Sequence, residues 1–242
     1  IPKMISNKFV CNQDAVKIHS YIATSKLTDD YAPTYWKDRG LWNKLDCFCK
    51  WGSLLMMFDE IKEKNMEKFD EIEQPDMRVV DLGVGEGPVP HVISNKGHDV
   101  SGVDNMRIDH PFKTSLVQMV LRDAKEFLTD LDEESVDVFI DSCSVTHFEF
   151  DRTSNIGWEK VLSASHSKLK SGGYFIISSD IHLKPENKRT GEFLIPEEIV
   201  FIAKNVGYDL PKEYDYDRVD AIRRTEGGET DLGVANFMFV KK

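Results

Sequence analysis

Long apolar runs and cysteine are both scarce in this sequence. No stretch approaches the roughly 20 consecutive apolar residues that a transmembrane helix needs, and no apolar run behind a basic segment marks a secretory signal at the start. Four irregularly spaced cysteines do not form the two pairs of a tetrahedral zinc site. These absences predict a cytoplasmic protein with reduced thiols, no membrane partner and no metal centre.

Positive charge is also in deficit. The chain has 31 Lys and Arg against 42 Asp and Glu, which gives a net charge of -11. Such an excess of negative charge repels a polyanionic partner, so nucleic acid is a disfavoured substrate. Internal repeats and low-complexity linkers are absent, and 242 residues suit one structural unit.

The chain changes character near residue 76. Apolar residues recur at helical spacing over 41–69, after an aromatic stretch (Tyr31, Tyr35, Trp36 and Trp42). We expect residues 1–76 to form a helical segment or lid packed on a core of residues 77–242. The aromatic side chains either close over a ligand or anchor the packing of this segment.

Strand-like and helix-like segments alternate in the core. This alternation predicts an α/β fold with a doubly wound, mostly parallel sheet covered by helices on both faces. Helices are clearest at 155–170 and 196–205, where Pro196 suits the first turn and Gly207 a C-terminal cap. The expected strands lie near residues 78–82, 99–103, 116–120, 136–140, 173–178, 213–218 and 234–240.

A glycine-rich turn follows the first core strand. Residues 79–87 read Val-Val-Asp-Leu-Gly-Val-Gly-Glu-Gly and lead into a helix-like segment. Glycines let the backbone turn sharply and let a ligand approach the main chain, and the helix start offers unpaired N–H groups. The pattern favours a nucleotide-like ligand, although tight strand-to-helix turns without a function also use glycine.

The second core strand ends on Asp104, seventeen residues after Gly87. In doubly wound nucleotide sites an acidic side chain at this position accepts hydrogen bonds from the two ribose hydroxyls. An Asp at a strand end can also serve only as a turn or cap residue. Its spacing from the glycine turn favours the ribose role.

The ordered series of motifs resembles the class I S-adenosylmethionine-dependent methyltransferase family through most of residues 77–242. The resemblance implies a seven-stranded, Rossmann-like sheet whose last strand, 234–240, runs antiparallel between its neighbours. It implies that residues 81–87 hold the methionine part of S-adenosylmethionine, that 122–124 contact the adenine and that 141–148 lie beside the methyl group. Residues 169–173 are similar to the family's turn before the fifth strand, with Ser171 in place of proline. The implied cofactor-binding residues are Asp81, Gly83, Gly85, Gly87, Asp104, Asn105, Asp123, Ala124, Asp141 and Ser142.

Three residues after strands four and five are candidates for a catalytic base. The family's reaction depends mainly on orientation, and a base helps when the acceptor must lose a proton. His147 is the first candidate because histidine as a residue type suits proton transfer near neutral pH, although it could instead bind the backbone or line the cofactor pocket. Asp180 and His182, at i and i+2 on an extended segment, could act together as base or substrate ligands, or bind a cation with Asp141.

The sequence thus predicts methyl transfer from S-adenosylmethionine to an oxygen or nitrogen atom of a small-molecule or sugar-like acceptor. A nicotinamide-dependent oxidoreductase is one alternative, because a glycine turn and a strand-two acid also suit its cofactor. A non-catalytic S-adenosylmethionine-binding protein is another. The patterns imply no particular oligomeric state.

Overall fold

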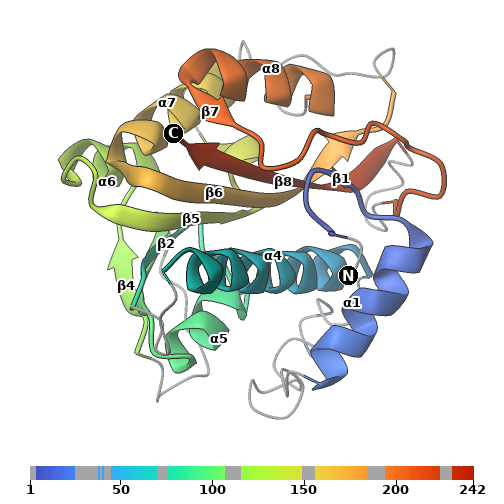
Figure 1. The fold of residues 1–242 in the computed structure, drawn as a ribbon, viewed down its shortest axis with the longest axis horizontal. Helices are drawn as coiled ribbons and strands as arrows, with labels where there is room; N and C mark the ends of the chain where they lie inside the picture. The colour runs from blue at the N-terminus through green and yellow to red at the C-terminus, as the bar shows by residue number, and fades with distance from the viewer. Residues whose placement is uncertain are drawn as a thin grey trace.

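The computed structural model describes residues 4–24, 38, 40, 45–69, 76–106, 116–148, 156–184, 194–223 and 231–242. Its centre is one mixed sheet with helices on both faces (Figure 1). The strands are β1 (Lys8–Phe9), β2 (Arg78–Leu82), β3 (Asp99–Asp104), β4 (Gln118–Leu121), β5 (Val136–Ser142), β6 (Leu169–His182), β7 (Tyr208–Asp209) and β8 (Leu232–Lys241). The helices are α1 (Asn12–Thr24), α4 (Leu45–Phe69), α5 (Val89–Asn95), α6 (Ala124–Asp130), the 3-10 turn η1 (Val145–His147), α7 (Ile156–Lys168) and α8 (Pro196–Val206).

The strand order is β1-β8-β6-β5-β2-β3-β4, and β7 also pairs with β8. Strands β2 to β6 pair in parallel, whereas β8 runs antiparallel to β6, β7 and β1. The predicted doubly wound, mostly parallel sheet with an antiparallel last strand is therefore confirmed. The described part of the sheet has eight strands rather than seven, because the N-terminal segment adds β1 beside β8.

One predicted strand is wrong. Residues 213–218 do not form a regular strand, and the short β7 precedes them at Tyr208–Asp209. The alternating Tyr and Asp residues imitate the period of a strand, but Asp215 and Asp217 accept hydrogen bonds from the backbone N–H groups two residues later. Such Asx turns bend the chain away from a ladder.

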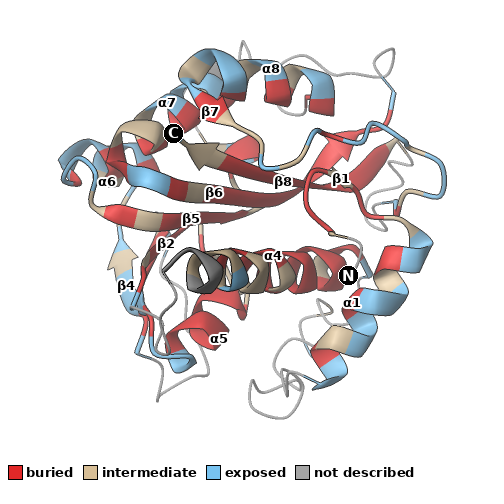
Figure 2. Cartoon of the chain, viewed as in Figure 1, coloured by how far each residue is buried: buried red, intermediate tan, exposed pale blue. Residues whose placement is uncertain are grey.

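Two layers of helices enclose the sheet. Figure 1 shows α4 running along one face beside α5 and α1, and α7 and α8 on the opposite face. The α4 residues Leu54, Phe58 and Ile61 are fully buried, as their helical spacing predicts, and belong to the first hydrophobic core. Trp158 of α7 belongs to the second core. Figure 2 shows the central strands buried and the outer surface of α1 exposed.

The ends of the α8 segment agree with the sequence. Pro196 is the first residue of the helix, where its missing N–H costs nothing. Gly207 ends the helix at φ 114°, the left-handed conformation that favours glycine. In the described part of the chain, no helix is both long and apolar enough to cross a membrane.

The N-terminal strand is attached to the sheet by Asn7. This residue is buried, has φ 56° and donates from its side chain to the carbonyl oxygens of Lys212 (2.8 Å) and Met238 (3.3 Å). Its Oδ1 accepts from the Met238 N–H at 2.8 Å. The short side chain of Asn therefore replaces the ladder at the point where β1 begins.

Replacing Asn7 by Ala should lower the free energy of unfolding by about 2 kcal/mol, because buried backbone groups lose their partners. Urea denaturation would measure the change, with the exposed Asn205→Ala on α8 as the control. An Asn7 variant as stable as the control would show that these hydrogen bonds contribute little.

Candidate functional site

Three neighbouring strands carry an aspartate as their last or next-to-last residue, at the same edge of the sheet. Asp81 is on β2, Asp104 on β3 and Asp141 on β5, and β2 pairs in parallel with both other strands. The chain connects β2 to β3 on one side and later returns to place β5 on the other. This is the topological switch point at which open α/β sheets bind ligands.

The glycine turn lies directly above this edge. Gly83 (φ 68°) and Gly85 (φ 51°) are left-handed, a conformation that other residues adopt at a cost. A Cβ atom on Gly83 would lie 2.3 Å from the Cβ of Ser144, and one on Gly87 would lie 3.2 Å from Nε1 of Trp51. Glycine is therefore required at residue 83 by both conformation and space.

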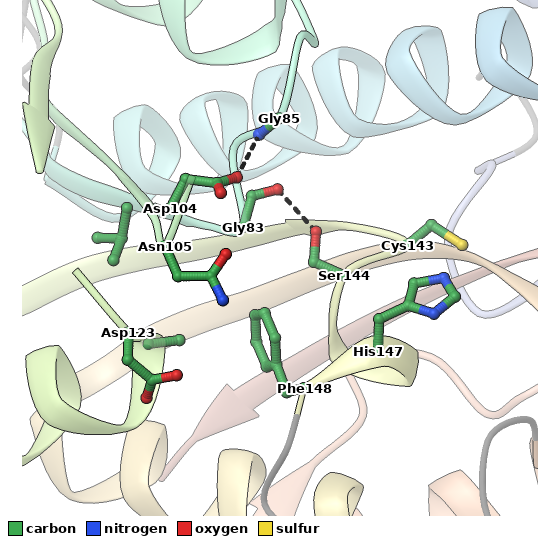
Figure 3. Close-up of a pocket in the computed structure, with 11 residues that line it drawn as sticks. Gly83, Gly85, Asp104, Asn105, Asp123, Cys143, Ser144, His147 and Phe148 are labelled. Atoms are coloured by element: carbon green, nitrogen blue, oxygen red, sulfur yellow. Dashed lines mark hydrogen bonds between the residues drawn. The ribbon is translucent and has the colours of Figure 1, made fainter. Parts of the chain in front are cut away.

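A cavity of about 300 Å³ opens beside the turn (Figure 3). It contains seven of the residues that the sequence assigns to cofactor binding or catalysis: Gly83, Gly85, Asp104, Asn105, Asp123, Ala124 and His147. Val103, Cys143, Ser144 and Phe148 complete its lining. The residues come from β3, α6, η1 and the loops that follow β2, β3, β4, β5 and η1.

The two cavity-lining aspartates also organise the backbone. Asp104 accepts from the N–H groups of Gly85 (3.0 Å) and Met106 (2.9 Å), so it holds the glycine turn against β3. Asp123 is the N-cap of α6, where its Oδ1 accepts from the N–H groups of Lys125 and Glu126. Both carboxylates are fixed in place at the wall of the cavity.

Two further predicted residues, Asp81 and Asp141, lie beneath the turn. They are 2% and 0% exposed, and no described residue forms a hydrogen bond with Asp81 Oδ1. Burial raises the pKa of Asp81 well above its ordinary value, and the nearby Asp141 and Asp104 add to the rise. Burial also raises the pKa of Asp141 to about 7, although the Ser144 and Val145 N–H groups donate to it and oppose the rise. A cationic ligand beside these carboxyls would favour their ionised forms and so lower both pKa values.

A second cavity of about 240 Å³ lies between α4 and the glycine turn. The predicted residues Gly87 and Ser142 line it, together with Cys47, Lys50, Trp51, Gly83, Val84, Gly85, Glu86, Cys143 and Ser144. Ser144 lines both cavities and donates from Oγ to the Gly83 carbonyl oxygen at 2.7 Å. The two cavities therefore meet at the contact between Ser144 and Gly83.

The three predicted base candidates separate into two places. His147 is exposed on η1 and lines the first cavity, and Figure 3 shows its ring toward Cys143 and away from Asp123. Asp180 and His182 are buried on β6 and line neither cavity. Asp180 forms an ion pair with Lys50 at 2.9 Å and accepts from the Cys143 thiol at 3.4 Å. Among the described residues, no group of three or more His, Cys, Asp or Glu side chains could hold a metal ion.

The sequence predicted a helical segment or lid over the core but did not identify which residues of α4 reach the site. Lys50 and Trp51 of this helix line the second cavity. A signal was present, because Lys50 lies four and eight residues before the buried Leu54 and Phe58, on the apolar stripe of the helix. A lysine on such a stripe is seldom fully buried without a charged partner. The predicted aromatic stretch (Tyr31, Tyr35, Trp36 and Trp42) lies outside the described residues.

Comparison with known proteins finds likeness in structure alone. No model of a known protein family and no curated protein sequence matches the chain. The chain is similar to a methyltransferase from Methanosarcina mazei, with 16% identity over 70% of this chain and 94% of that chain and a TM-score of 0.49. It is similar to another from Archaeoglobus fulgidus, with 20% identity over 76% of this chain and 94% of that chain and a TM-score of 0.48. It is also similar to the 1,6-didemethyltoxoflavin-N1-methyltransferase of Burkholderia thailandensis, with 16% identity over 94% of this chain and 86% of that chain and a TM-score of 0.49. That structure was solved with S-adenosylhomocysteine bound. All three are S-adenosylmethionine-dependent methyltransferases.

Proposed function

We propose that this protein is a class I S-adenosylmethionine-dependent methyltransferase that acts on an oxygen or nitrogen atom of a small-molecule acceptor. The observation that supports this proposal best is the switch-point site, where Asp81, Asp104 and Asp141 surround a left-handed glycine turn. The antiparallel β8 between β6 and β7 is the strand arrangement that the sequence resemblance implies. A cytoplasmic location is part of the same proposal.

The residues at the site suit this cofactor chemically. S-adenosylmethionine carries a sulfonium and an ammonium group against one carboxylate, and therefore has a net positive charge. The pKa values of the buried Asp81 and Asp141 are raised, and a bound cation would favour the ionised form of both carboxyls. The resemblance implies that Asp104 would accept from ribose hydroxyls and that Asp123, with the N–H of Ala124, would contact an adenine. All three residues line the first cavity, which supports these roles.

The bound cofactor would supply an activated methyl group on its sulfonium. The protein then has to align the acceptor atom and exclude water, and the glycine turn lies between residues of α4 and the loop after β5 that would help to do so. His147 would accept a proton at a ring nitrogen from a hydroxyl acceptor, or keep an amine acceptor neutral. Asp180 is held by Lys50 and Cys143, so we assign it a positioning role instead.

Calorimetric titration tests the cofactor. Wild-type protein should bind S-adenosylmethionine and S-adenosylhomocysteine and should give no heat with NAD or NADP. The Asp104→Ala variant should bind both sulfur compounds roughly 5- to 150-fold more weakly, because it loses charge-assisted hydrogen bonds of about 1 to 3 kcal/mol.

The exposed Asp132→Ala provides the control and should retain wild-type affinity. Heat with a dinucleotide alone would contradict the proposal and favour an oxidoreductase. Cofactor binding without methyl transfer to any acceptor would favour a non-catalytic binding protein.

A further inference from the structure

Ser144 joins two loops of the candidate site that lie far apart in the sequence. It follows β5 and immediately precedes η1, and its Oγ donates to the Gly83 carbonyl oxygen at 2.7 Å across 61 residues of chain (Figure 3). The loops approach so closely that a Cβ atom on Gly83 would lie 2.4 Å from Ser144 Oγ. The hydroxyl therefore occupies the space that a side chain on the glycine turn would need.

The backbone of Ser144 is held on both sides. Its N–H donates to Asp141 Oδ1 at 2.8 Å, and its carbonyl oxygen accepts from the His147 N–H at 2.8 Å. The preceding residue, Cys143, has φ 64°, a left-handed conformation that costs free energy in a residue other than glycine. Such a conformation persists only where the surrounding contacts hold it. The hydrogen bonds from Ser144 to Asp141 and Gly83 are among those contacts.

A hydrogen-bonded path thus runs from the glycine turn through Ser144 to His147. At one end, Asp104 accepts from the Gly85 N–H at 3.0 Å and fixes the turn to β3. At the other end, η1 carries His147 into the lining of the first cavity. The spacing between the cofactor-binding turn and the proposed base therefore depends on one side chain.

We infer that Ser144 is a positioning residue that couples the glycine turn to η1 and so holds His147 at a fixed distance from the bound cofactor. The inference rests on the proposed function and assigns it one further residue. Because the chain itself makes these hydrogen bonds, the turn and η1 are ordered before a ligand binds. Binding then costs less conformational entropy than it would with two independent loops.

Cofactor affinity tests the role of the hydroxyl. In calorimetry, Ser144→Ala should bind S-adenosylhomocysteine roughly 3- to 10-fold more weakly than wild type, because loosened loops must be ordered on binding. Ser144→Thr keeps the hydroxyl and should bind within about twofold of wild type. The matched control is Ser135→Ala. Ser135 also donates to a carbonyl oxygen at 2.8 Å, that of Asp132, but it lies at the opposite end of β5, and its loss should leave the affinity unchanged.

Amide hydrogen exchange, followed residue by residue by NMR, distinguishes coupling from a merely structural role. In wild-type protein, S-adenosylhomocysteine should slow the exchange of both the Gly85 N–H and the His147 N–H. In Ser144→Ala it should slow the Gly85 N–H alone, because the order of the turn no longer reaches η1. In the Ser135→Ala control both N–H groups should respond as in the wild type.

The outcomes separate the inference from the function on which it rests. A melting curve for each variant confirms that the fold is retained. Wild-type affinity of Ser144→Ala, or equal slowing of both N–H groups in that variant, would overturn the coupling. Affinity of Ser144→Thr as low as that of Ser144→Ala would overturn the assignment to the hydroxyl. Failure of wild-type protein to bind S-adenosylhomocysteine would instead overturn the proposed function.

Discussion

Replacing Lys50 alone by Gln is expected to lower the free energy of unfolding by about 3 to 5 kcal/mol, because it leaves an uncompensated buried charge. Asp180 and Asp46 are 3% and 2% exposed, and both lie within 4 Å of the ammonium. Neither carboxylate can regain in the interior the hydration that it loses on folding. Urea denaturation at pH 7 measures the effect directly.

Adding Asp180→Asn to the Lys50 variant should recover most of this loss. A buried ion pair that is exchanged for neutral groups of similar size often costs little, whereas a broken pair is expensive. Lys64→Gln, which removes a part-exposed lysine from the same helix, should change stability by less than about 1 kcal/mol. Equal stability of the single and double variants would contradict a direct coupling between Lys50 and Asp180.

Raising the pH from 4 to 8 should destabilise the protein through Asp141. The pKa of this carboxyl is about 7 in the folded chain against an ordinary value of 3.8, and burial is the largest cause. The folded state therefore binds more protons than the unfolded state between these two values. Protonated Asp141 adds its full contribution to the free energy of unfolding below about pH 4. Between about pH 4 and 7 this contribution falls by about 1.4 kcal/mol per pH unit, because the carboxyl ionises in the unfolded chain but keeps its proton in the folded chain. Above about pH 7 the folded chain loses the proton as well, and the contribution is gone.

The comparison of wild-type protein with Asp141→Asn isolates this contribution. Asn cannot ionise, so the free energy of unfolding of the variant should lack this part of the pH dependence. The groups that face Asp141 are the Asp81 carboxyl of β2 and the N–H groups of Ser144 and Val145. Denaturation at five pH values between 4 and 8 gives the difference in slope, and the exposed Asp132→Asn should keep the wild-type slope. Identical slopes for wild type and the Asp141 variant would show that Asp141 stays ionised.

The position of the proposed cofactor site could be predicted from the sequence because its parts are local. A strand, a glycine turn and a helix follow one another within residues 78–95, and Asp104 ends the next strand. Parallel strands then bring their carboxyl ends to one edge without further information. The same rule placed Asp123 and His147 in the lining of the cavity.

The rule that ligands bind at the carboxyl ends of parallel strands did not predict the surroundings of Asp180 and His182, although both residues lie near such an end. β6 continues as a buried, paired strand to His182, so these side chains contact the layers around the sheet and not the cavity. The alternation of residues over 213–218 likewise predicted a strand that does not form, because local Asx turns replace the hydrogen-bond ladder there. Periodicity shows that a segment can form a strand, but it carries no information about the pairing partner.

By itself, then, the sequence determined the doubly wound sheet, the glycine turn and the acids that follow neighbouring strands, since each depends on residues close together in the chain. Only the tertiary structure decided that β1 joins the sheet, that Lys50 of α4 meets Asp180 of β6, and that Asp141 is buried deeply enough to shift its pKa. Those features depend on contacts between distant segments and on the exclusion of water, and local sequence patterns predict neither of these.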